Sequence, residues 1–193
     1  MSLVAATLHD PFVGIMTDYF AAATDEDAAA TIDLPGGPGG SGPYEPADEF
    51  RAAFEAARLA GDREALRRLL RPRLHWSEHG LQVLSVKGIH PDLDLGRLWA
   101  LLAGVPFQVR RHTSSLVAER DGGDEIVVLL SDELHRLLAG QTAEQLDAFA
   151  VPWSQQFHGT TDADALSHFL HELSQLARDA LDRAHRLYCW VAL

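Results

Sequence analysis

The last seven residues, LYCWVAL at 187–193, limit most strongly the folds open to this chain. Apolar side chains occupy both alternating sets of positions, and in a β-strand these two sets point to opposite faces. A strand of this kind needs apolar cover on both sides. We therefore expect it in the interior of a sheet, with strands beside it and packed layers above and below.

A long amphipathic helix is predicted directly before this strand, beginning at Asp162. Its apolar residues recur three and four positions apart, which is the spacing of one helix face. These residues are Leu166, Phe169, Leu170, Leu173, Ala177, Ala180, Leu181 and Ala184.

The remaining patterns predict further strands and helices. SSLVAER and EIVVLL, joined by DGGD at 121–124, give the clearest hairpin signal, and residues 17–23 and 81–87 also have strand patterns. Helices are predicted after Thr24, from Ala47 to Ala60, from Asp62, from Pro91 to Gly104, after Ser131, and from Thr142 with an interruption near Pro152. The sequence thus predicts one α+β domain with about five mostly antiparallel strands and helices mainly on one side.

The domain is expected to span residues 16–193. A chain of 193 residues, 47% of them hydrophobic, suits a single globular domain. Residues 1–15 show no structural period, so we expect a disordered leader or vector-derived segment with Met16 as the natural start. Residues 35–46, PGGPGGSGPYEP, are rich in glycine and proline and predict a loop. This loop lacks the Gly-Lys-Ser/Thr end of a phosphate-binding loop.

Net charge indicates which classes of partner to expect, and cysteine content indicates the cellular compartment. The formal net charge of −12 repels phosphate backbones and anionic lipids, so we expect neither nucleic acid nor membrane as a partner. Cys189 is the only cysteine, which excludes an internal disulfide and favours a reducing, cytoplasmic location. Nothing in the sequence predicts the oligomeric state.

Residues 75–79, HWSEH, fit the H-x-x-E-H pattern of inverted zinc peptidases. On a helix, His75 and His79 would share a face and could hold zinc, with Glu78 as the base. Pro72 and Gly80 suit the two ends of such a helix. The same placement has a structural explanation, because a histidine in the last helical turn is stabilised by the helix dipole.

A zinc site would need a third ligand from elsewhere in the chain. Glu144 and Asp147 are candidates, although only their distance along the sequence recommends them. Chance occurrence of the motif is not rare in a chain with ten histidines. His168 and His171 lie on the long helix, where a solvated face and a metal-binding pair are both open alternatives.

Two basic features are alternative binding sites. Lys87 is the only lysine, and it lies three residues before His90 at a predicted strand-to-helix turn, which suggests a ligand site. The only basic cluster consists of Arg67, Arg68, Arg71 and Arg73. We expect it to complement a helix C-terminus and nearby carboxylates, with an anion site as the alternative.

Three groups of residues carry a family resemblance: DYFAAATDEDAAATIDLPGGP, VKGIHP with LGRLWALLAG, and VPWSQ with the helix leading into RLYCWVAL. Together they resemble a family of uncharacterised bacterial proteins and are remotely similar to YfbM-like proteins of unknown function. The resemblance implies an α+β fold for residues 16–193 and a start near Met16. It implies no reaction, and HWSEH lies outside it.

The sequence therefore predicts an acidic, non-enzymatic intracellular protein that binds a protein partner or a small ligand. No catalytic residue is assigned, because the chain lacks the G-x-S-x-G elbow of serine hydrolases and a cysteine in an electropositive turn. Two alternatives stay open. One is a zinc-dependent hydrolase using the HWSEH segment, and the other is a small-molecule-binding domain.

Overall fold

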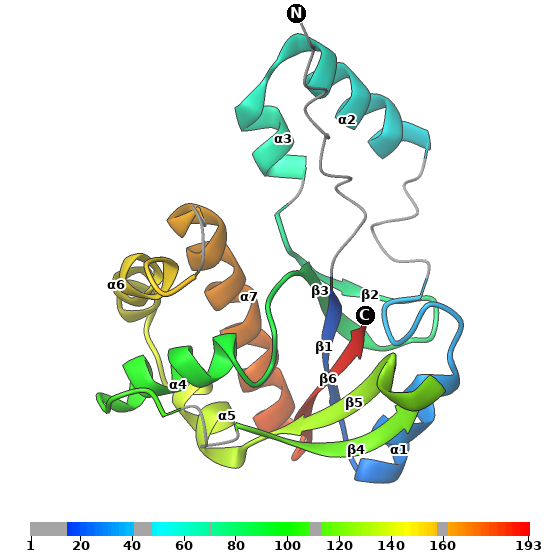
Figure 1. Ribbon diagram of the computed structural model, residues 1–193, viewed down its shortest axis with the longest axis vertical. Coiled ribbons are helices and arrows are strands. Elements are labelled where there is room, and N and C mark those ends of the chain that lie inside the picture. The colour runs from blue at the N-terminus through cyan, green and yellow to red at the C-terminus, as the bar shows by residue number, and fades with distance from the viewer. Residues whose placement is uncertain (1–14, 41–47, 70, 109–112, 158–161) are drawn as a thin grey trace, which may run out of the picture.

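A computed structural model describes residues 15–40, 48–69, 71–108, 113–157 and 162–193. It confirms a single α+β domain with an antiparallel sheet and helices gathered mainly on one face (Figure 1). The sheet has six strands in the order β2-β3-β1-β6-β5-β4, one more than predicted. The strands are β1 (Met16–Ala22), β2 (Leu74–Trp76), β3 (Gln82–Lys87), β4 (Ser114–Arg120), β5 (Glu125–Leu130) and β6 (Arg186–Ala192).

The additional strand is β2, within the segment for which a helix is predicted. The other predicted strands are confirmed, and β4 and β5 form the expected hairpin. The C-terminal strand β6 lies between β1 and β5, so its interior position is also confirmed. The leader prediction concerns residues 1–15, of which 1–14 lie outside the described residues, and β1 begins at Met16.

The described helices agree closely with the amphipathic patterns. They are α1 (Asp25–Ala30), η1 (Thr31–Asp33), α2 (Asp48–Ala60), α3 (Arg63–Leu69), α4 (Asp94–Ala103), η2 (Asp121–Gly123), α5 (Asp132–Ala139), α6 (Ala143–Ser154) and α7 (Ala163–Asp182). The interruption predicted near Pro152 does not occur, because α6 continues through this residue to its last turn. None of the described helices combines the length and the apolar character needed to cross a membrane.

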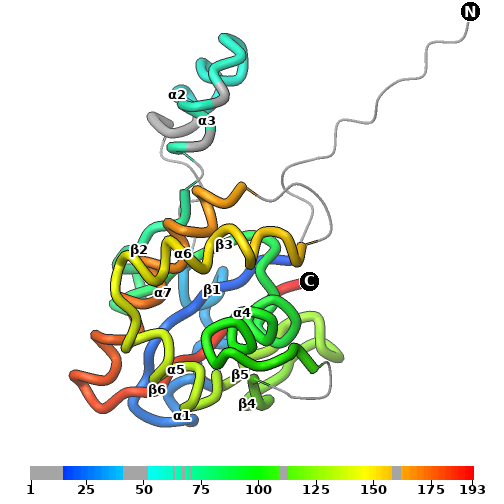
Figure 2. The backbone as a smooth tube through the Cα atoms, turned by 90° about the vertical axis from the view of Figure 1, so that its left-hand side faces the viewer, coloured from blue at the N-terminus to red at the C-terminus, as the bar shows by residue number. Residues whose placement is uncertain are grey.

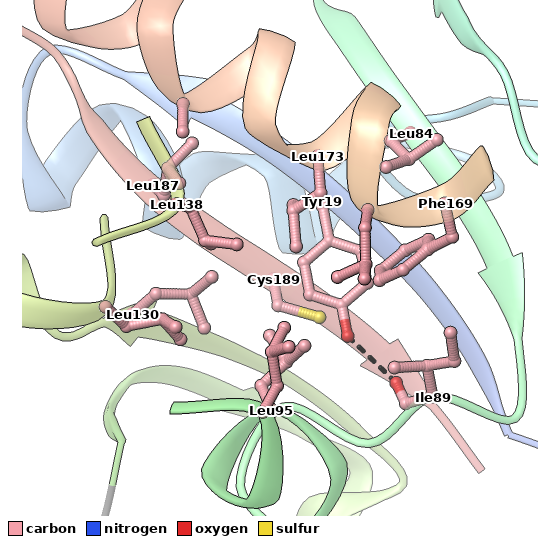
Figure 3. Close-up of a cluster of buried hydrophobic side chains, with 14 of the residues drawn as sticks. Tyr19, Leu84, Ile89, Leu95, Leu130, Leu138, Phe169, Leu173, Leu187 and Cys189 are labelled. Atoms are coloured by element: carbon pink, nitrogen blue, oxygen red, sulfur yellow. Dashed lines mark hydrogen bonds between the residues drawn. The ribbon is translucent and has the colours of Figure 1, made fainter. Parts of the chain in front are cut away.

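The larger core lies between the sheet and α4 to α7. Tyr19, Leu84 and Cys189 point from three strands toward Phe169 and Leu173 of α7 (Figure 3). The Tyr19 hydroxyl donates a hydrogen bond to the Ile89 carbonyl at 2.9 Å, which satisfies the polar end of a fully buried side chain. Burial raises the pKa of the Cys189 thiol well above its ordinary value, so this thiol is held neutral within the core.

A smaller core covers the opposite face of the sheet beneath α1 and η1. The chain then crosses this face through the strap, which we define as Pro35–Gly40. Gly37 N–H donates to the Leu34 carbonyl and Gly40 N–H to the Gly37 carbonyl. Each bond closes a β-turn with proline in its second position, where the fixed proline φ is favourable. The loop predicted at 35–46 is confirmed as far as Gly40, and residues 41–47 lie outside the described residues.

The α2–α3 helical hairpin lies beyond one end of the sheet, apart from α4 to α7, in both views (Figures 1 and 2). Its main packing contacts are between its own two helices. The chain returns from α3 to the sheet through Arg71, Pro72 and Arg73 and enters the edge strand β2. The position of the hairpin therefore places this arginine-rich return segment at the edge of the sheet.

Candidate functional site

The helix predicted for HWSEH is wrong, because these residues belong to a β-hairpin. His75 and Trp76 lie on β2, and residues 77–80 form the turn into β3. Ser77 N–H donates to the Leu81 carbonyl and Gly80 N–H to the Ser77 carbonyl. Gly80 has φ +74°, as the last residue of a three-residue hairpin loop requires. The glycine interpreted as a helix stop is thus the left-handed residue of a hairpin.

The hairpin places the two motif histidines on different local structures. His75 lies on β2 opposite Val83, and its Nδ1–H donates to the Arg73 carbonyl at 3.3 Å. His79 lies in the turn, with Nε2 at 3.7 Å from Glu78 Oε1. Both Nε2 atoms are buried and have no hydrogen-bond partner. Within the described ranges, no group of three or more His, Cys, Asp or Glu side chains could hold a metal ion.

Asp147, one of the third ligands considered, is engaged elsewhere. Its Oδ1 accepts hydrogen bonds from Ser167 Oγ at 2.5 Å and from His171 Nε2 at 2.9 Å. These two bonds lower the pKa of the Asp147 carboxyl and join α6 to α7. Glu144, the other candidate, lies in the first turn of α6. His171 therefore has a structural role, and zinc binding by His75 and His79 stays a prediction.

The turn that carries Lys87 and His90 is built around a histidine cap. His90 Nδ1 accepts hydrogen bonds from Asp92 N–H at 3.1 Å and Leu93 N–H at 3.4 Å. Asp94 Oδ2 in turn accepts the His90 backbone N–H at 2.8 Å. Because Nδ1 acts as an acceptor, this geometry favours the neutral tautomer with its proton on Nε2. Half-buried Lys87 ends β3. Ligand binding by this pair stays a prediction.

A buried acid that the sequence analysis did not single out lies under the strap. Asp18 is 4% exposed, and its Oδ2 accepts the Gly39 N–H at 2.9 Å. Burial raises the pKa of this carboxyl, against lowering contributions from Ser85, Gly39 and His75 in that order. The Ser85 hydroxyl lies beside the carboxylate but forms no hydrogen bond of good geometry. An acid within an otherwise apolar strand pattern was the available sequence signal.

The strap approaches the sheet too closely for side chains. A Cβ added at Gly39 would lie 2.6 Å from Asp18 Oδ2, and one at Gly37 would lie 2.8 Å from the Trp190 ring. One at Gly40 would lie 2.7 Å from Glu78 Oε1. The glycines therefore allow the strap to pack on β6, β1 and the β2–β3 turn in succession. This arrangement closes the strap over Asp18 and Ser85, and neither side chain is accessible to a substrate.

An exposed surface at the β2 edge is the best candidate for function. We define the Arg/Trp surface as Arg68, Arg71, Arg73 and Trp76. All four residues are exposed, and Trp76 retains 67% of its surface. The other three tryptophans, Trp99, Trp153 and Trp190, are buried. Trp76 belongs to the HWSEH segment, for which the sequence predicts a helix, so the sequence did not indicate an exposed tryptophan on an edge strand.

Residues of α7 border the Arg/Trp surface. Glu172 Oε2 accepts the Leu74 N–H at 2.8 Å, which fixes β2 to this helix. Burial lowers the pKa of His168, and the positive charges of Arg71 and Arg73 lower it further against the raising effect of Glu172. The two arginines therefore lie close enough to α7 to act on His168. Trp76 thus lies on a strand that is held in place by α7.

Comparison with known proteins gives no relative for this chain: no family model, curated protein or solved structure matches it. The resemblance to uncharacterised bacterial proteins accordingly stays a prediction.

Proposed function

We propose that this is a non-catalytic protein that binds a protein partner through the Arg/Trp surface. The observation that carries the proposal is Trp76, a large aromatic side chain that is 67% exposed on an edge strand. Tryptophan and arginine are the residue types most enriched at the energetic centres of protein interfaces. Here both occur within nine consecutive residues, from Arg68 to Trp76.

The contacts of β2 with β3 and α7 support this role. A strand at a sheet edge can present side chains to a partner without the entropic cost of ordering a loop. Glu172 also occupies the Leu74 N–H, so this amide is not available to an added strand. Recognition would therefore depend on side chains rather than on extension of the sheet. The single cysteine, buried in the core, agrees with a cytoplasmic setting.

Site-specific photocrosslinking in cells of the natural source tests this proposal. A photoreactive amino acid replaces Trp76 in one variant and Val151 in a control, because Val151 is also exposed, at 52%, but lies on α6. We expect a discrete protein adduct from position 76 that is absent from position 151. The adduct should also disappear when Arg71→Glu and Arg73→Glu are combined with the probe. Identical adducts from both positions would refute the proposal.

A zinc-dependent hydrolase is the second candidate, and the buried Nε2 atoms of His75 and His79, which lack hydrogen-bond partners, are the observation in its favour. Elemental analysis of protein purified without a histidine tag, repeated on His75→Ala, separates the two candidates. Stoichiometric zinc that is lost in the variant would support the hydrolase. Substoichiometric metal that is unchanged in His75→Ala would remove the reason for considering it.

A further inference from the structure

The Arg/Trp surface contains three neighbouring arginines whose side chains are not paired with carboxylates. The guanidinium groups of Arg68, Arg71 and Arg73 form no hydrogen bond or ion pair among the described residues, although the chain contains 28 acidic residues. Apart from Arg136 on α5, the other arginines whose side chains are described are bonded to carboxylates or to backbone carbonyls. These are Arg58, Arg97, Arg120, Arg178, Arg183 and Arg186. The expectation that nearby carboxylates neutralise the basic cluster is therefore not met at these three side chains.

The neighbouring carboxylate does not compensate their charge. Glu172 borders the surface, but its Oε2 accepts the Leu74 N–H and its Oε1 lies 3.8 Å from His168 Nε2. In the sequence, residues 63–73 hold five arginines and one acid, Glu64. A local positive charge thus persists within a protein of net charge −12. Such a local excess attracts a complementary partner and sets its orientation.

We infer that the partner presents a short acidic protein segment to Arg68, Arg71 and Arg73, with an apolar side chain placed against Trp76. This inference rests on the proposed function and specifies the chemistry of the partner. Arg73 directly precedes the edge strand β2 and Trp76 ends it, so along extended backbone the two positions are about 10 Å apart and their side chains point to opposite sides of the strand. A few residues of an extended acidic segment that passes across this open sheet edge can contact both.

Charge also distinguishes an acidic protein segment from nucleic acid. A nucleic acid strand carries about one negative charge every 3.4 Å along its length, so most of it would extend beyond the arginines. The net charge of −12 would repel those phosphates. A short acidic segment places its carboxylates only at the basic surface and contributes an apolar contact as well.

Fluorescence anisotropy with labelled probes tests the inference on the full chain at low ionic strength. The first probe is an acidic peptide of Asp and Glu residues around one leucine. The second has Asn and Gln in place of the acids, and the third is single-stranded oligothymidylate. We expect the acidic peptide to bind about tenfold or more tightly than its amide counterpart. The oligonucleotide should bind more weakly than the acidic peptide.

Paired charge reversals locate the binding. Arg71→Glu with Arg73→Glu should weaken acidic-peptide binding about tenfold or more, and Trp76→Ala should weaken it as well. Arg136→Glu on α5 is the matched control, because Arg136 is also exposed and unpaired, and it should change affinity less than about twofold. Equal denaturation midpoints confirm that each variant folds.

Three results would overturn the inference. They are equal binding of the acidic and amide peptides, an equal loss of binding in Arg136→Glu, and tighter Arg71/Arg73-dependent binding of oligothymidylate. A separate result refutes the proposed function: photocrosslinking that gives no protein adduct specific to position 76. Specific crosslinking from that position without acidic-peptide binding would leave the protein partner in place and reject its acidic character.

Discussion

Replacing Gly39 with alanine should strongly destabilise the domain, because the strap leaves no space for a methyl group. The added Cβ would lie 2.6 Å from Asp18 Oδ2 and 3.0 Å from Ser85 Oγ. Strap and sheet must then separate, and the Gly39 N–H bond to Asp18 is lost. A hydrogen bond to a charged group contributes about 1.5–3 kcal/mol, and a buried acceptor left unsatisfied costs more. We expect a loss of about 2–4 kcal/mol, a large part of the roughly 5–15 kcal/mol typical of a domain.

A double-mutant cycle shows whether this loss arises at Asp18. Urea unfolding, followed by circular dichroism, gives the free energy of unfolding for the original protein, Gly39→Ala, Asp18→Ala and the double variant. Removing the Asp18 carboxylate relieves the steric conflict, so Gly39→Ala should cost less than about 1 kcal/mol in that background. Additive losses would show that the strap and Asp18 are not coupled and would refute this reasoning.

Four other changes have expected outcomes that follow from the same contacts. Asp18→Asn should stabilise the protein at about pH 7, because burial raises the folded-state pKa of Asp18 and ionisation of the buried carboxyl therefore opposes folding. The gain in the free energy of unfolding should shrink as pH falls toward 3.8, and urea titrations at several pH values measure it. His135 donates a hydrogen bond to the Ala177 carbonyl, and its pKa is lowered mainly by burial. The contribution of neutral His135 to stability is therefore present above pH 6.5 and is lost as pH falls toward the folded-state pKa. In the same titrations, His135→Gln should reduce the fall in the free energy of unfolding below pH 6.5. Glu172→Ala should cost about 1–2 kcal/mol and accelerate hydrogen exchange at the Leu74 amide, whereas unchanged exchange would contradict the proposed fixing of β2. Trp76→Ala should alter the free energy of unfolding by less than about 0.5 kcal/mol, and a larger loss would assign Trp76 a structural role instead.

Elements with a strong local pattern were predictable from the sequence. The apolar residues of α7 recur three and four positions apart, and those of β6 lie on both faces of the strand. Each pattern therefore shows directly which faces of the element are buried. DGGD likewise identified the β4–β5 hairpin through its glycines. These signals are local, and tertiary packing reinforced them.

The helix prediction for HWSEH was wrong because a helix end and a hairpin turn share the same sequence signals. A glycine with positive φ ends many helices and also closes three-residue hairpins, so Gly80 could not distinguish them. Only three residues of β2 precede the turn, too few for a period to appear. Pairing with β3 and the Glu172 bond to Leu74, which is distant in the sequence, decided the outcome.

The candidate surface depended on tertiary structure in the same way. The burial of Asp18 requires the strap to cross the sheet, and no local pattern encodes that crossing. The arginines were visible as a cluster, but their lack of ion pairs depends on where α7 and its carboxylates lie. The exposure of Trp76 follows from its place on an edge strand.

The central claim is that a protein partner binds against Trp76, and the indole N–H resonances of the four tryptophans test it most directly. Trp76 is exposed while the other three are buried, so ¹⁵N-labelled protein provides one surface probe and three core probes. The protein recovered by crosslinking at position 76 is then titrated in. We predict that the Trp76 resonance shifts while those of Trp99, Trp153 and Trp190 stay in place. Saturating partner that leaves the Trp76 resonance unchanged would contradict the account.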